Sequence, residues 1–183
     1  SMDALALTLR EENKFAEAIE YYDRLLRDEE RLGKSINIIG TLSNLGFCHY
    51  MNQNQSKALE YFADAEGRLK AIEDAGGKVA NGNGDGEAIK VDLGGGGTSA
   101  KGFDLFSRRM LIVSFRAKIY EALDRPDLAL DTYQRKLATL QNAEGDKLAR
   151  AEEISILQNN IGALQLKMGL HDSAKASFVA AEA

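Results

Sequence analysis

Residues 45–65, LGFCHYMNQNQSKALEYFADA, carry a pattern that returns three more times along the chain. In this stretch Gly46 precedes Ala58 by twelve residues, and Phe62 follows that alanine by four. The same spacing of two small residues and an aromatic ring occurs at Ala6, Ala18 and Tyr22, at Ala117, Ala129 and Tyr133, and at Gly162, Ala174 and Phe178. Self-similarity of this kind is the signature of a repeat architecture.

Each copy of the pattern predicts two antiparallel helices joined by a short turn. Turn and capping residues fill the stretch between the two small residues, at 13–14, 52–56, 124–127 and 169–172. Apolar residues that alternate by three and four indicate an amphipathic helix in the last copy; they are Ile154, Leu157, Ile161, Leu164 and Met168. We expect the first small residue to let the paired helices approach closely, and the ring to fill the space against the next pair.

These residues resemble the tetratricopeptide repeat, on "Leu45-Gly46 … Ala58-x-x-x-Phe62-x-x-Ala65" and "Ile161-Gly162 … Ala174-x-x-x-Phe178-x-x-Ala181". The resemblance covers nearly all of the chain outside 76–102, although Leu42, Val113 and Gln158 stand where the family has an early Trp. It implies an all-α fold, a solenoid of about four antiparallel helix pairs. Ala18 and Ala58 are 40 residues apart, against 34 in the common repeat, so the repeats are of a long type similar to LGN, kinesin light chain and rapsyn.

The repeats predict three segments of chain. Residues 1–75 would form the first two repeats and residues 103–183 the last two, in one continuous solenoid that is a fragment of a longer protein. Residues 76–102 hold ten glycines and few large apolar side chains, so we expect a flexible surface loop there.

Two sharper interpretations of the glycine-rich segment stay open. Gly82-x-Gly84-x-Gly86 faintly resembles a phosphate-cradling loop, although no strand is expected before it and no Lys-Ser or Lys-Thr follows. The second is a calcium loop, whose ligands and glycine would be Asn81, Asn83, Asp85, Gly86 and Asp92. Asn81 replaces the usual first carboxylate of such a loop, and glycines rather than helices flank it.

Composition argues against several classes of function. A net charge of −5 disfavours nucleic acid as a partner, because nucleic-acid binding needs clustered Lys and Arg. The sequence contains no run of eighteen apolar residues, so it predicts no membrane-spanning helix. Its single cysteine, Cys48, suits a reducing compartment, and we therefore expect a cytoplasmic protein. Besides that cysteine the sequence holds only two histidines. We expect His49 and Cys48 to have structural roles and His171 to be an exposed or capping residue in a turn, so the sequence predicts no enzyme, no metal site and no cofactor.

The expected function is protein–protein interaction, as an adaptor or scaffold. A solenoid of helix pairs presents a concave face lined by the first helix of each pair. The predicted partner-binding residues on that face are Ser43, Asn44, Phe47, Tyr50, Lys118, Glu121, Asn159, Asn160 and Lys167. Asn44 and Asn160 are the strongest candidates, because an amide can donate to and accept from the backbone of an extended peptide. The alternative is that these amides bond to the neighbouring helix pair.

Two further expectations concern the partner. Some family members clamp the terminal carboxylate of a peptide with Lys, Asn and Arg side chains. Of the positions that they use, only Asn44 matches here, and the others hold Asp3, Leu7, Leu111 and Phe115. No such clamp is therefore expected. The rival function is a structural segment without a free groove. The sequence ends in Phe178-Val179-Ala180-Ala181 with no polar capping helix, and this uncapped end could mediate homo-oligomer formation.

Overall fold

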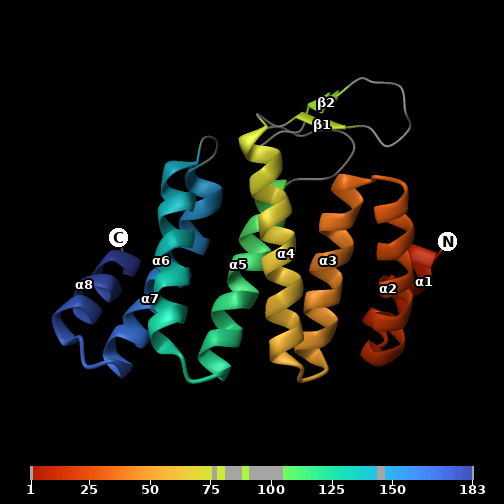
Figure 1. Cartoon of the computed structure of the whole chain (residues 1–183). Coiled ribbons are helices and arrows are strands. Elements are labelled where there is room, and N and C mark those ends of the chain that lie inside the picture. Colours follow the sequence, from red (N-terminus) through yellow and green to blue (C-terminus); the bar gives the residue numbers. More distant parts are fainter. Residues whose placement is uncertain (1, 76–77, 81–87, 91–104, 144–146, 183) are drawn as a thin grey trace. The chain divides into compact units, whose positions relative to one another are not determined.

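The computed structural model describes residues 2–75, 78–80, 88–90, 105–143 and 147–182 (Figure 1). The described residues form eight helices and one pair of short strands. They are α1 (Met2–Glu11), α2 (Phe15–Arg31), α3 (Ser35–Met51), α4 (Gln55–Asp74), β1 (Lys78–Ala80), β2 (Ala88–Lys90), α5 (Leu105–Ala122), α6 (Pro126–Asn142), α7 (Lys147–Lys167) and α8 (His171–Glu182). The all-helical class expected from the repeats is confirmed.

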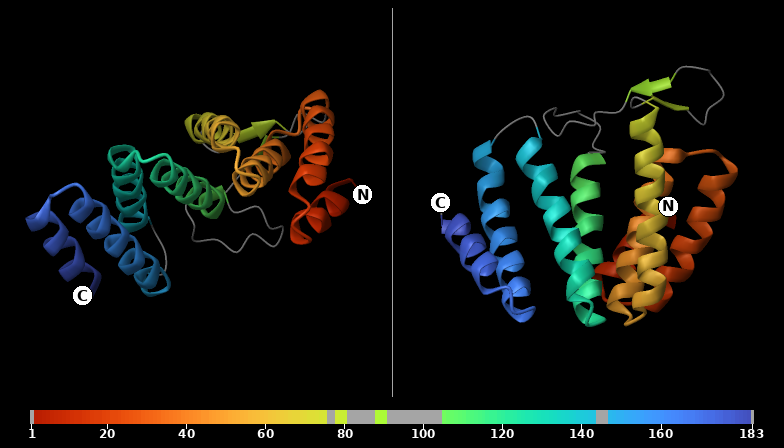
Figure 2. Two further views of the ribbon diagram at one scale, coloured as in Figure 1. Left: turned by 90° about the horizontal axis from the view of Figure 1, so that it is seen from below. Right: turned by 60° about the vertical axis from the view of Figure 1, so that its left-hand side comes forward.

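The helices fall into two compact units. The first contains α1 to α4, the strand pair and the start of α5 as far as Ile112. The second contains the rest of α5, from Val113, with α6, α7 and α8. Within the first unit each helix from α1 to α4 packs on the next, and within the second α7 packs on both α6 and α8 (Figure 2). Each unit therefore has the helix-pair organisation that the sequence repeats predict.

The turn inside each helix pair has the same backbone geometry in all four pairs. Asn13, Gln53, Asp124 and Gly169 occupy it with φ of 60°, 61°, 54° and 77°. The amide of the following residue donates back to a carbonyl in the first helix, for instance from Asn54 to His49 at 2.8 Å. This is the Schellman arrangement, which ends a helix with a left-handed residue. The carbonyl of Asn54 then accepts a hydrogen bond from the amide of Ala58, in the first turn of α4.

The small residues of the repeat lie where paired helices touch. A Cβ at Gly46 would be 2.8 Å from a carbon of the Phe62 ring, and a Cβ at Gly162 would be equally close to the Phe178 ring. The expected close approach at these glycines is therefore present. The position of the ring differs from the expectation, however. Each ring covers the glycine of its own pair, whereas the sequence suggested that it fills space toward the next pair.

A short antiparallel strand pair lies in the glycine-rich segment. Lys78 pairs with Lys90, Val79 with Ile89, and Ala80 with Ala88. The sequence predicts no strand at these positions, because three-residue strands leave little periodicity to detect. Other residues of the segment, including those of the phosphate-loop and calcium-loop interpretations, lie outside the described residues. No helix in the described parts of the chain is long and apolar enough to cross a membrane.

Candidate partner-binding surfaces

In the first unit, the first helices of the two pairs are joined through Arg10 on α1. Its Nη1 donates to Oδ1 of Asn44 on α3 at 2.9 Å. Its guanidinium also lies over the Phe47 ring, 5.5 Å from the centroid. Phe47 in turn meets the edge of Phe15, on α2, with 6.2 Å between the ring centroids. We call Arg10, Asn44 and Phe47 the arginine cluster.

The arginine cluster shows one of the two contacts considered for Asn44. Its carbonyl oxygen bonds to the neighbouring helix pair, which is the alternative that the sequence analysis kept beside peptide binding. Asn44 is half-buried, and within the described residues its two N–H donors make no side-chain hydrogen bond. Asn44 can therefore both hold Arg10 and donate to a partner.

The other three predicted residues of the first unit have different environments. Ser43 is buried, and its hydroxyl donates to the Ile39 carbonyl at 2.7 Å. This position does not line an accessible surface, because α3 is covered on that side, and Ser43 is removed from the candidate set. Phe47 and Tyr50 are half-buried, so both keep exposed surface beside Asn44.

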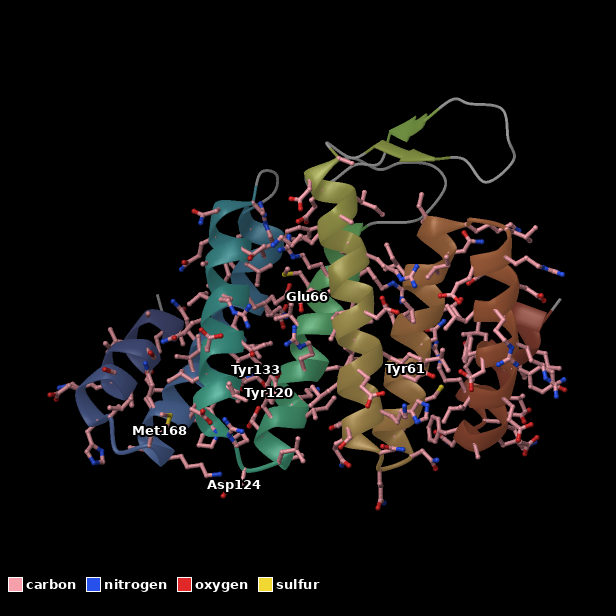
Figure 3. The ribbon with its side chains drawn as sticks, in the orientation of Figure 1. Tyr61, Glu66, Tyr120, Asp124, Tyr133 and Met168 are labelled. Atoms are coloured by element: carbon pink, nitrogen blue, oxygen red, sulfur yellow. The ribbon has the colours of Figure 1, made fainter. Side chains whose placement is uncertain are left out.

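In the second unit, three predicted residues are exposed but already engaged. Lys118 Nζ lies 5.7 Å from the Phe115 ring centroid. Glu121 accepts a hydrogen bond of 2.7 Å from the Tyr133 hydroxyl, which ties α5 to α6. Lys167 pairs with Asp124 at 2.8 Å, and its ammonium group lowers the pKa of that carboxyl. Asp124 lies at the turn after α5, as Figure 3 shows.

The face of α7 that carries Asn159 and Asn160 is open. Both asparagines are exposed, and so are Ile156, Ala163 and Leu166. These residues are three or four apart along one helix, so they share one face, which we call the α7 stripe. The two asparagines were predicted from the sequence, whereas Ile156 and Leu166 were not. Their spacing from the asparagines was the available signal, whereas the buried stripe of Leu157, Ile161 and Leu164 drew attention to the opposite face.

The two residues with catalytic potential in the first unit are packed into it. The His49 ring stacks on Tyr61, with centroids 5.2 Å apart, and burial lowers its pKa. Cys48 is buried, and burial raises the pKa of its thiol to about 11. Within the described residues no three His, Cys, Asp or Glu side chains gather in a way that could hold a metal ion.

This arrangement of helix pairs is a tetratricopeptide-like α-solenoid. More particularly, residues 1–71 match the family model "Tetratricopeptide repeat". Among curated proteins, none matches the sequence. Thirty-seven chains of solved structures match, among them BtubC (BKLC) from P. vanneervenii, with a TM-score of 0.69 and 18% identity. That match covers 97% of this chain but 59% of BtubC, and it shows a shared fold. Tetratricopeptide repeats are non-enzymatic modules that generally mediate protein–protein interactions.

Proposed function

We propose that this protein is an interaction module whose first helices hold an extended segment of a partner protein. The observation that carries the proposal is the α7 stripe, where Ile156, Asn159, Asn160 and Leu166 are all exposed on one helix face. A helix that needed only to pack within its repeat would place polar residues on its outer face. Here apolar side chains, each more than half exposed, flank two amides instead.

The chemistry of the α7 stripe suits an extended peptide. Asn159 and Asn160 each offer an acceptor oxygen and two donor hydrogens, which match the N–H and C=O groups of a peptide backbone. Ile156 and Leu166 lie on either side of the asparagines and offer apolar contact for side chains of the peptide. Backbone pairing would supply affinity, and the flanking apolar contacts would supply selectivity.

The domain arrangement and location belong to the same proposal. Residues 1–75 and 103–183 would act as repeats of one solenoid, with 76–102 as an insert between them. An adaptor or scaffold of this kind would work in the cytoplasm, where its one cysteine stays reduced.

The test is selection of ligands from a random library of twelve-residue peptides displayed on phage. Wild type and the Asn159→Ala/Asn160→Ala variant would be used as bait, with Gln134→Ala/Asn142→Ala as a matched control. The control removes two exposed amides from α6 of the same unit. We expect a class of peptides that wild type and control enrich and that bind the Asn159/Asn160 variant about ten-fold more weakly or worse. Failure to enrich any peptide, or equal loss in both variants, would contradict the proposal.

A second candidate function is self-association through α8. Tyr22 and Phe62 are fully buried and Tyr133 nearly so, yet the equivalent Phe178 is only half-buried. Val179, the next residue, is 61% exposed. In the second unit the outer side of α8 therefore keeps apolar surface that a second copy of the chain could cover.

Sedimentation velocity over a range of concentrations separates this candidate from a monomeric module. Self-association predicts a mass that rises with concentration and falls back on Val179→Glu. Leu123→Glu, which adds the same charge at an exposed leucine after α5, serves as the control and should leave the mass unchanged. A constant monomer mass for wild type rules out self-association through α8.

A further inference from the structure

Most arginines with a recorded polar contact in this structure neutralise a carboxylate. Arg68 pairs with Asp64 and Glu30, both at 3.0 Å, Arg125 with Asp127, and Arg135 with Asp131. Arg10 is different, because the partners recorded for it among the described residues are an amide oxygen and an aromatic ring. Within the described parts of the chain, its positive charge is held in position by these two contacts and not by an acid.

The setting of Arg10 fixes its direction. A guanidinium has five N–H donors in a planar fork, and the bond to Asn44 uses one of them. The Phe47 ring supports the cation, and Phe15 supports that ring. Arg10 is half-buried, so it is partly desolvated before any ligand arrives. A charged group that is already oriented and partly dry loses less entropy and less hydration on binding.

A second guanidinium adds to the positive charge of this region. Burial lowers the pKa of Arg108, near the start of α5, and the positive charge of Arg10 lowers it further. Both residues belong to the first unit, so two cations interact there through a partly dry environment.

We propose that the arginine cluster is an anchor for a carboxylate side chain, so that the segment held by the first unit contains an aspartate or glutamate. The inference rests on the proposed function, which it makes more specific. A carboxylate can receive two parallel N–H bonds from one guanidinium, and Asn44 can donate a further one. Aspartate and glutamate are the anions that an unmodified protein segment carries within its length.

The arrangement differs from a clamp for the terminal carboxylate of a peptide. Only Asn44 stands at a position that such clamps use, and the cation here comes from Arg10 instead. An acidic side chain within a segment therefore suffices, and no free chain end is required. Peptides displayed at the N-terminus of a phage coat protein suit the test, because they have no free carboxyl end.

The experiment compares ligand selection by three forms of the full chain: wild type, Arg10→Gln and Arg24→Gln. Arg24 is the matched control, because it is an exposed arginine of the same unit that also lies over a tyrosine ring, at 5.7 Å. We expect wild type and Arg24→Gln to enrich a class of peptides with an aspartate or glutamate at a fixed position. Arg10→Gln should lose that class. A representative peptide of this class should bind Arg10→Gln about ten-fold more weakly than it binds wild type. The same peptide with its glutamate replaced by glutamine should lose about as much affinity for the wild-type chain.

The outcomes distinguish this inference from the function it rests on. Enriched peptides without an acidic position would overturn the carboxylate anchor and leave the interaction module standing. No enriched peptides at all would overturn both. Equal loss in Arg10→Gln and Arg24→Gln would show a general charge effect and refute the anchor.

Arg10→Lys keeps the positive charge but not the planar fork of N–H donors, so it guards against a folding artefact. Arg10→Lys should still enrich acidic peptides, with an affinity between those of wild type and Arg10→Gln. If Arg10→Lys unfolds at the same temperature as wild type but enriches no acidic peptides, the result counts against the anchor.

Discussion

At the scale of single residues, two of the four helix pairs have a glycine where an added Cβ would collide with an aromatic ring. Gly46 and Gly162 lie beneath the rings of Phe62 and Phe178, and a Cβ at either site would lie 2.8 Å from ring carbons. Helical glycine normally costs stability relative to alanine, because it adds freedom to the unfolded chain. Here the cost is offset by the direct contact between ring and backbone that only glycine allows.

The first prediction concerns the sign of a glycine-to-alanine change. Gly46→Ala should lower the free energy of unfolding by about 1–3 kcal/mol, because the buried Phe62 ring must shift. Gly67→Ala, in α4, should raise it by about 0.5–1 kcal/mol, because a Cβ there meets nothing within 4 Å. Urea unfolding measures both. Two changes of the same sign would contradict the packing described here.

Cys48 gives a second prediction at this scale. Burial raises the pKa of its thiol to about 11, so roughly a thousandth of it is thiolate at pH 8. A disulfide reagent such as DTNB should therefore react slowly with the native protein and promptly after urea unfolding. Rapid stoichiometric labelling of the native protein at pH 8 would show that the thiol is accessible and not packed in the core.

At the scale of elements, the turn is the unit that repeats most faithfully. The left-handed position is held by Asn13, Gln53, Asp124 and Gly169, which are four different residue types. Sequence analysis located these turns from their polar and glycine residues. It could not identify the left-handed residue in each, because glutamine has no intrinsic preference for that conformation. At Gln53 the packing of the two helices imposes a backbone that the local sequence does not favour.

This strain yields the third prediction. Gln53→Gly should raise the free energy of unfolding by about 0.5–1 kcal/mol, because glycine adopts a φ of 61° without a Cβ clash. The same replacement inside a helix, Gln134→Gly in α6, should lower it by a similar amount. Urea unfolding of the two variants provides the comparison. A destabilising effect of Gln53→Gly would mean that the turn holds glutamine for a contact not identified here.

At the scale of the whole molecule, sequence predicted the fold class better than the candidate surface. The spacing of small and aromatic residues predicted the helix pairs, because that spacing reflects contacts inside one pair. The burial of Ser43 and the use of Asn44 by Arg10 depend on neighbouring pairs, which a single repeat cannot reveal. Ile156 and Leu166 were missed because both are apolar and yet exposed. Apolar residues on a helix normally predict burial, and here the structure leaves both more than half exposed.

Whether the first helices of the pairs form the binding surface can be mapped by NMR. A peptide selected on the wild-type chain would be titrated into ¹⁵N-labelled protein, with the side-chain amides of asparagine and glutamine followed individually. We expect the largest shifts at Asn159 and Asn160, or at Asn44 together with the Arg10 guanidinium for an acidic peptide. Gln134 and Asn142, on a second helix, should not shift. Shifts confined to Gln134 and Asn142, or to the exposed side of α8 at Val179, would contradict the claim.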